Sequence, residues 1–147
     1  MIQQESTRSV PPRTSAVRVA GGVVLAATVA VAVNAIIAAL AHAAGADDQF
    51  KPLTIGAFGP LSVVGVFAGA LGWALVRRLA RRPAAVLRRL VPVVVVLSFI
   101  PDTLLLVGDG QAGTSALGVV ALMLMHVAVA TVAVPVFRRV LPVAARD

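Results

Sequence analysis

Four long apolar stretches dominate the sequence, and each is as long as a membrane-spanning helix. They run over about 19–43, 53–76, 90–107 and 115–137. At 1.5 Å of rise per residue, each reaches across roughly 30 Å of hydrocarbon, although the third is near the minimum length. Hydrophobic residues make up 59% of the chain and charged residues only 13%, whereas a soluble domain carries about 25% charge. We therefore predict an all-α integral membrane protein, with a four-transmembrane-helix bundle over residues 17–142.

The positions of the arginines predict the orientation of this bundle. All twelve lie in the N-terminal tail, in the segment over residues 77–89 or in the C-terminal tail. The other two connections carry Lys51 against Asp47, Asp48 and Asp109. Because Lys and Arg concentrate in cytoplasmic loops, both termini are predicted to be cytoplasmic (N-in/C-in).

The first apolar stretch has an alternative interpretation as a cleaved signal peptide. Ala41-His42-Ala43 has the small-x-small form of a cleavage site, and basic residues precede the stretch. The apolar run is about 25 residues long, however, and a signal core has roughly 7–15. We therefore expect a membrane helix, preceded by a disordered cytoplasmic tail over residues 1–16. Residues 143–147 form a second cytoplasmic tail.

The segment RRLARRPAAVLRR over residues 77–89 is predicted to contact anionic lipid head groups. Basic residues near the cytoplasmic leaflet each contribute roughly 1 kcal/mol to such contacts. Docking of an acidic cytoplasmic partner is the alternative, and Pro83 is expected to end the continuation of the second helix. Nucleic acid is excluded as a partner because the chain has no Tyr, only 4% aromatic residues and no soluble domain. The lipid-contacting arginines are Arg77, Arg78, Arg81, Arg82, Arg88 and Arg89.

Small residues recur at spacings of three and four in three of the stretches, which predicts close helix packing. The first stripe contains Ala27, Ala30, Asn34, Ala38 and Ala41, and the second contains Ser62, Gly65, Gly69 and Gly72. The third aligns Gly118, Leu122, His126, Ala130 and Ala133. Asn34 and His126 are therefore expected to face inward. Gly65 and Gly69 also fit GxxxG, for which packing inside the bundle and a homo-oligomer are both open.

Four polar residues within the stretches are the candidate ligand-binding residues: Asn34, Ser98, Asp102 and His126. Pro101 cannot donate to the carbonyl of Leu97, which predicts an open acceptor and a kink. Ser98 and Asp102 are four residues apart and so share a helix face. An aspartate at mid-depth costs roughly 2.5–3.5 kcal/mol, which points to function, although Asp102 near the helix end also fits a snorkelling or loop-capping role.

His126 lies in the middle of the fourth stretch and has several interpretations. A hydrogen-bonded packing residue, a proton relay and a haem or metal ligand are all compatible with a lone membrane histidine. At 1.5 Å per residue, His126 lies roughly 14–16 Å from the outer surface and Asp102 about half as deep. A direct contact between them then needs a helix offset or the Pro101 kink, and a bridging water is the easier link.

Several chemistries are excluded by what the sequence lacks. There is no cysteine, so disulfides, thiolate metal sites and Cys-x-x-Cys reductases are ruled out. The sequence GDGQAG over residues 108–113 matches GxGxxG. A dinucleotide-binding site also needs a βαβ unit and an acidic residue about 20 positions further on, and the sequence has neither. Two histidines and one aspartate at different depths make no metal-ligand spacing. No metal and no cofactor are predicted.

Four segments carry a resemblance to a known family: FKPLTIGAFGP, GALGWALVRR, LRRLVPVVVVLSFIPD and LMLMHVAVATVAVPVFRRVLP. Over residues of about 50–142 the chain resembles an uncharacterised family of small four-helix membrane proteins from high-GC bacteria, a domain of unknown function. The resemblance implies a bacterial plasma (inner) membrane location and a family pattern that includes Pro101, Asp102 and His126. It implies no activity.

The function predicted from these observations is that of a small polytopic membrane protein without catalysis of its own. Its bundle would bind a lipid or small apolar ligand, or support a membrane partner. The alternatives are a membrane-embedded acid/base enzyme acting on a lipophilic substrate and a small proton-coupled transporter subunit. Both would use Asp102 and His126. No residue is assigned as catalytic, and these two are the candidates.

Overall fold

The computed structural model describes residues 16–108 and 111–143, and this part of the chain is helical throughout its regular structure. The elements are α1 (Ala16–Ala43), the short 3-10 helix η1 (Lys51–Leu53), α2 (Ile55–Leu79), α3 (Pro83–Leu104) and α4 (Ala116–Val140). All four α-helices are long and apolar enough to cross a membrane. The predicted set of four helices of membrane-spanning length is therefore confirmed, and these helices indicate a multi-pass membrane protein. The predicted tails lie outside the described residues, except that Ala16 begins α1 and Val143 follows α4.

The boundary between the second and third helices differs from the prediction. The segment over 77–89 is mostly helical, because α2 runs to Leu79 and α3 begins at Pro83 rather than near residue 90. Pro83 does not terminate α2; it occupies the first turn of α3, where a residue without an N–H is tolerated and the fixed φ suits the helix. At its other end α3 stops at Leu104, three residues before the predicted end.

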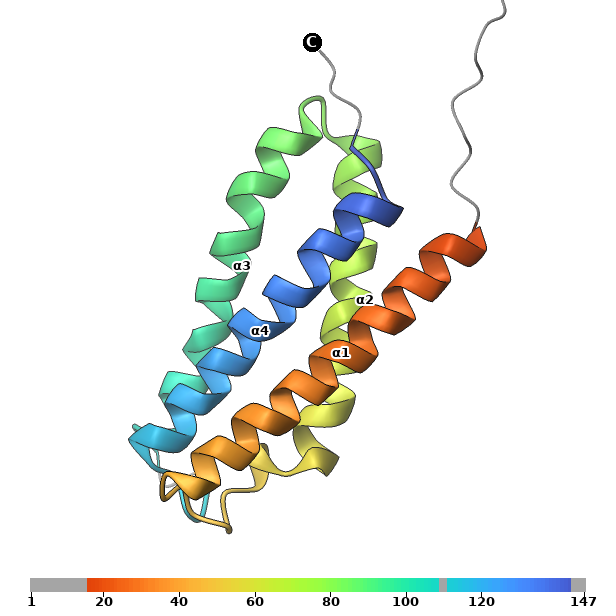
Figure 1. Cartoon of the computed structure of the whole chain (residues 1–147). Helices are drawn as coiled ribbons and strands as arrows, with labels where there is room; N and C mark the ends of the chain where they lie inside the picture. Colours follow the sequence, from red (N-terminus) through yellow and green to blue (C-terminus); the bar gives the residue numbers. More distant parts are fainter. Residues whose placement is uncertain (1–15, 109–110, 144–147) are drawn as a thin grey trace, which may run out of the picture.

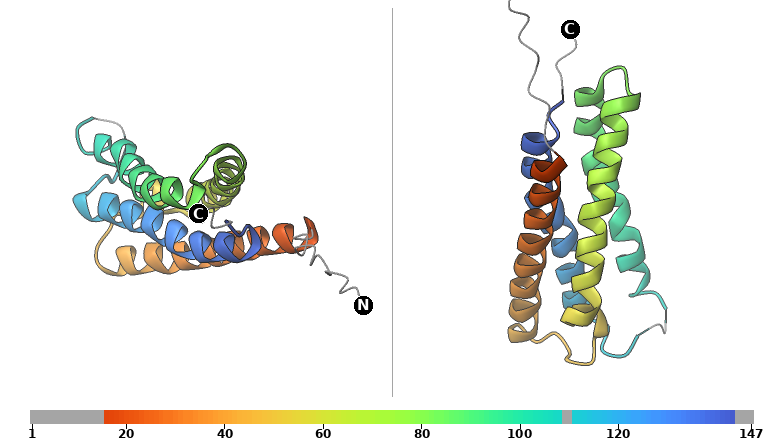
Figure 2. Two further views of the ribbon diagram at one scale, coloured as in Figure 1. Left: turned by 90° about the horizontal axis from the view of Figure 1, so that it is seen from above. Right: turned by 90° about the vertical axis from the view of Figure 1, so that its right-hand side faces the viewer.

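The helices form a bundle in which α4 is central. In Figure 1, α4 runs between α1 and α3, and α2 lies behind them. Seen from above in Figure 2, α1 and α3 lie on opposite sides of α4. Helix α2 packs against each of the other three. A ligand site on the α3 side of α4 is therefore formed mainly by α2, α3 and α4.

The small-residue face of α1 makes the close packing that the sequence predicts. All five residues of its stripe are buried. Helix α1 also lies close to α4 at Gly22, where an added Cβ would lie 2.6 Å from Cγ1 of Val140. Small side chains thus let the α1 and α4 backbones approach, which is the main packing resource where lipid removes the hydrophobic drive.

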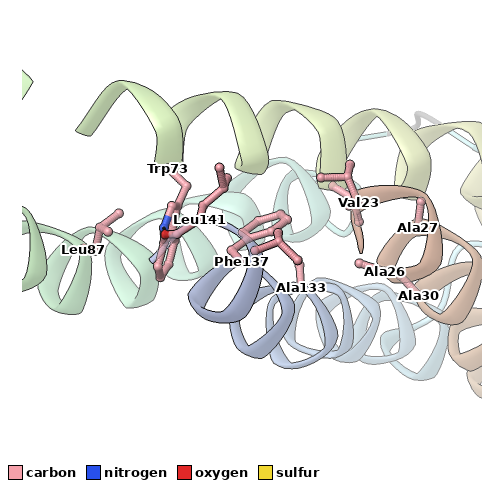
Figure 3. Close-up of a cluster of buried hydrophobic side chains, with 11 residues drawn as sticks. Val23, Ala26, Ala27, Ala30, Trp73, Leu87, Ala133, Phe137 and Leu141 are labelled. Carbon is pink, nitrogen blue, oxygen red and sulfur yellow. Dashed lines mark hydrogen bonds between the residues drawn. The ribbon is translucent and has the colours of Figure 1, made fainter. Parts of the chain in front are cut away.

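Two apolar clusters fill the ends of the bundle. One, drawn in Figure 3, surrounds Trp73 and Phe137, whose rings are 5.9 Å apart, and Trp73 Nε1 donates a hydrogen bond to the Leu141 carbonyl at 3.1 Å. The other surrounds the fully buried Phe50 and includes residues of α1, α2 and α4. The polar residue Asn34 lies on α1 between members of the two clusters, Ala30 and Ala38.

Charge is segregated between the two ends of the bundle. Arg18 is in the first turn of α1, Arg77 and Arg78 are in the last turn of α2, and Arg138 and Arg139 are in the last turn of α4. The start of α3 lies at this same end, which is the upper end in Figure 1. Lys51, Asp47 and Asp48 belong to the connection at the opposite end. The one-sided pattern in the sequence is thus one-sided in space.

Candidate functional site

A cavity of about 680 Å³ lies between α2, α3 and α4. Most of its lining is apolar, and its polar lining residues come from all four helices. The structure therefore brings the four candidate residues to a single cavity and adds a fifth polar residue to them. These residues are Asn34, Ser62, Ser98, Asp102 and His126.

The glycine face of α2 forms one wall of this cavity. A Cβ added at Gly65 or Gly72 would meet nothing within 4 Å, and one at Gly69 would lie 3.3 Å from the Phe137 ring. The predicted tight helix packing is therefore wrong at Gly65 and Gly72, whereas Gly69 and the buried Ser62 are closely packed. Helix α2 instead buries the face that carries Phe58, Ser62, Val66 and Trp73. Without side chains, the three glycines leave room beside α3.

Helix α3 forms the opposite wall and is the least buried of the four helices. Its buried residues are Pro83 and Leu87 near one end and Asp102 near the other. Between them Val91, Val95 and Ser98 line the cavity. The helix is thus packed at its two ends and stands off from the bundle in the middle.

The cavity opens sideways between α2 and α3. Leu61 on α2 and Val94 on α3 both line it, yet they are 70% and 53% exposed. These rim residues are apolar, as is the outer surface of both helices. A molecule in surrounding hydrocarbon would therefore meet an apolar entrance.

Asp102 and His126 are in direct contact at this cavity. His126 Nδ1 lies 3.2 Å from Asp102 Oδ2. The link through a bridging water is therefore not needed. Counting residues from the outer surface had placed Asp102 at about half the depth of His126. Asp102 lies two residues before the end of α3, whereas His126 lies ten residues after the start of α4, so their contact means that these two helix ends are at different levels. The Asp102 residue is buried, whereas the His126 side chain is 39% exposed.

The tautomer of His126 follows from its second neighbour. Nδ1 is also 2.9 Å from the Leu122 carbonyl oxygen, one turn earlier in α4. A carbonyl oxygen only accepts hydrogen bonds, so Nδ1 carries the proton and Nε2 of the neutral ring is an acceptor. Asp102 Oδ2 is within ion-pair distance of Nδ1 but has no hydrogen bond of its own. The ring is thus held through Nδ1, and Nε2 remains for other partners.

Asn34 is held by Ser62 across the α1–α2 contact. Ser62 Oγ donates to the Phe58 carbonyl at 2.7 Å and accepts a hydrogen bond from Asn34 Nδ2 at 2.8 Å. Because the hydroxyl proton is used at Phe58, the amide nitrogen must face Ser62. Asn34 Oδ1 is then left buried without a hydrogen-bond partner. Asn34 is 2% exposed, so the expectation that it faces inward is confirmed.

Ser98 lies on the cavity-lining face of α3 together with Asp102, as their spacing predicts. Its Oγ donates to the Val95 carbonyl of the same helix at 2.6 Å. The hydroxyl oxygen keeps accepting capacity toward the cavity.

Residues 14–143 match a family of unknown function, DUF6069. The chain belongs to this family. The match extends over all four helices of this family member, including α1, which the resemblance of the sequence segments did not cover. No curated protein and no solved structure matches the chain.

Two residues that line the cavity, Ser62 and Trp73, were not predicted as site residues from the sequence. Ser62 appeared only as a small residue in a stripe, although a hydroxyl at the level of Asn34 was a signal for an interhelical hydrogen bond. Trp73 lines the cavity and is the only tryptophan of the chain.

No group of three His, Cys, Asp or Glu side chains within residues 16–108 and 111–143 is placed to hold a metal ion.

A second groove, of about 780 Å³, lies at the arginine-bearing end of the bundle. Its lining combines apolar residues with Arg88 of α3 and Arg138 of α4. It shares Trp73, Leu87, Val91 and Val134 with the first cavity, so the two adjoin. Of the other predicted lipid-contacting arginines, Arg78, Arg81, Arg82 and Arg89 are exposed. Arg77 instead donates a hydrogen bond to the Pro142 carbonyl at 3.3 Å.

Proposed function

We propose that this protein is a membrane-embedded binding protein for a small lipophilic molecule. The observation that carries the proposal is the cavity of about 680 Å³ with Asp102 and His126 in contact at its wall. Its volume falls in the range of small-molecule sites, roughly 300–1,000 Å³, and such sites are largely apolar with a few polar groups that fix orientation. Ionisable residues inside membrane domains are costly and mark functional sites.

The position of the entrance supports a ligand that arrives through the hydrocarbon. The rim residues Leu61 and Val94 are exposed and apolar. A molecule dissolved in the acyl chains can pass between α2 and α3 without crossing a polar surface. A lipid or lipid-like molecule therefore suits this site better than a water-soluble metabolite.

Trp73 provides a direct test, because it lines the cavity and is only 5% exposed. We would titrate purified protein in lipid nanodiscs with ω-bromododecanol, whose terminal bromine quenches indole fluorescence on contact. Bromine that stays in the bilayer does not reach a buried indole, so saturable quenching is expected only if the probe enters the cavity.

Leucine substitutions on α2 make this test specific. Gly65→Leu places a large side chain in the cavity wall. It is expected to raise the probe concentration needed for half-maximal quenching at least tenfold. Gly56→Leu is the matched control, because its Cβ also meets nothing within 4 Å and Gly56 does not line the cavity. Unsaturable quenching, or equal quenching in both variants, would contradict the proposed function.

The direct contact between Asp102 and His126 favours a second candidate function, proton-coupled transport or acid/base chemistry on the ligand. Proton transfer needs two groups within hydrogen-bond reach of a common partner, and these two side chains are 3.2 Å apart. Proteoliposomes with an entrapped pH dye would show protein-dependent proton movement under a pH step. This candidate fails if Asp102→Asn moves protons as fast as the parent chain.

The arginine-bearing end is proposed to face the cytoplasm and to contact anionic lipid head groups at the plasma membrane. The support is the gathering of the arginines at one end of the bundle, together with the groove that carries Arg88 and Arg138. This arrangement would place both termini in the cytoplasm.

A further inference from the structure

We infer that the ligand of the α2–α3–α4 cavity carries a hydrogen-bond donor, as a lipophilic alcohol, phenol or amine does. This inference rests on the proposed function and names the chemical class of the ligand. It follows from the hydrogen-bonding capacity that the cavity-lining side chains leave unused.

The first unused group is the amide oxygen of Asn34. Its nitrogen is committed to Ser62 at 2.8 Å, so Oδ1 is directed away from that contact and has no partner. Asn34 is more than nine-tenths buried and lines the cavity. An amide oxygen accepts hydrogen bonds and cannot donate them. Only a donor can therefore satisfy it.

The second unused group is the carboxylate of Asp102. Oδ2 is enclosed and has no hydrogen-bond partner, although His126 Nδ1 is 3.2 Å away. Arg88 and Arg89, the two arginines of α3, lie near the opposite end of that helix. This carboxyl oxygen can accept a hydrogen bond from a ligand.

The third group is Nε2 of His126. Because Nδ1 carries the proton toward the Leu122 carbonyl at 2.9 Å, Nε2 of the neutral ring presents a lone pair. Three side chains from three helices, α1, α3 and α4, therefore offer unused acceptors at one cavity. A molecule with only carbonyl or ether oxygens cannot satisfy them, whereas an O–H or N–H group can.

The length of the cavity agrees with an elongated ligand. Ser62, which holds Asn34, and Trp73 both line it and are eleven residues apart on α2. At 1.5 Å per residue this is roughly 16 Å, similar to an extended twelve-carbon chain. A donor group bound near Asn34 would thus place the far end of such a chain beside Trp73.

The test compares three probes that share one chain and one bromine: ω-bromododecanol, its methyl ether and ω-bromododecylamine. Trp73 quenching in nanodiscs gives the affinity of each for the parent chain. We expect the alcohol or the amine to bind at least about ten times more tightly than the ether, because the ether leaves buried acceptors unpaired. A further preference for the amine over the alcohol would assign the donor to a cationic head group, and equal affinities would show that a neutral donor is sufficient.

A double variant, Asn34→Leu with Ser62→Ala, removes the amide acceptor together with its partner, so that no half of the pair is left buried. The preference over the ether is expected to fall severalfold in this variant and to persist in Gly56→Leu. Equal binding of alcohol, amine and ether by the parent chain would overturn the inference and leave the proposed function standing. Absence of saturable quenching by any of the three would overturn both.

Discussion

Asn34, Ser62 and Asp102 are the buried polar residues of the described part of the chain. In hydrocarbon, a polar group without a partner costs several kcal/mol, because no water is present to replace the missing hydrogen bond. Ser62 is satisfied through Phe58 and Asn34, whereas Asn34 Oδ1 and Asp102 Oδ2 are not. Their position at the wall of a cavity supports the proposed ligand site at the scale of single residues.

The Asn34–Ser62 hydrogen bond leads to a prediction about stability. Ser62→Ala is expected to lower the free energy of unfolding by about 1–2 kcal/mol, since Asn34 Nδ2 loses its acceptor. Adding Asn34→Leu to Ser62→Ala is expected to recover most of this loss, because neither polar group then remains buried. Denaturant titration in mixed micelles measures both values.

Thr28→Val is the control for this pair of variants. Thr28 is exposed, and its hydroxyl bonds only the Val24 carbonyl of its own helix at 3.1 Å. Its replacement is expected to change stability by less than about 0.5 kcal/mol. A double variant less stable than Ser62→Ala alone would contradict the predicted recovery of stability.

Among the elements, α3 differs most from its neighbours. The helices α1 and α4 approach closely through alanines, whereas α3 is packed at its ends and forms a cavity wall between them. Its contact with the core depends on Leu87 at one end and on Asp102 at the other. Asp102, a candidate for ligand binding, is thus also one of the few buried residues through which α3 contacts the rest of the bundle.

The start of α4 supplies an element-level prediction. Gly118 packs on the fully buried Phe50, and an added Cβ would lie 2.8 Å and 2.9 Å from two ring carbons. Gly118→Ala is therefore expected to destabilise the protein by roughly 1–3 kcal/mol through overpacking. Gly56→Ala, which meets nothing within 4 Å, should leave the unfolding midpoint nearly unchanged. Thermal unfolding in detergent gives the comparison, and equal midpoints would mean that the Phe50 contact is not tight.

At the scale of the whole molecule, the segregated charge predicts which loops face which side. The chain contains no cysteine, so a single introduced cysteine reports its own location. Gln49→Cys is expected to react with a membrane-impermeant maleimide added to intact cells. Ala84→Cys, at the arginine-bearing end, is expected to react only after the cells are opened. The reverse pattern would place the termini outside and contradict the proposed orientation.

The groove beside Arg88 and Arg138 predicts selective retention of anionic lipid. Arg88→Gln with Arg138→Gln removes two charges, each worth roughly 1 kcal/mol toward an anionic surface, or about thirtyfold in affinity together. Native mass spectrometry with phosphatidylglycerol and phosphatidylcholine measures the retained lipid. Arg81→Gln with Arg82→Gln serves as the control, since these residues do not line the groove. Equal losses in the two variants would indicate a diffuse charge effect and no site.

The four helices and the segregation of charge could be predicted from the amino-acid sequence alone. Both are local properties: the length of an apolar run sets whether it spans, and arginines at the ends of such runs must lie at the ends of helices. The α1 stripe was also readable, because small residues at helical spacing permit close approach wherever a partner helix lies.

Which helix faces meet could not be predicted from the sequence and follows from the packing of the folded chain. Helices in lipid are apolar on every side, so no polar face in the sequence marks the outside. The glycines of α2 looked like a packing face and proved to line a cavity, because α3 is held away by its contacts at both ends. Likewise, the contact between Asp102 and His126 depends on how α3 and α4 pack against each other. This packing is not encoded in either segment alone.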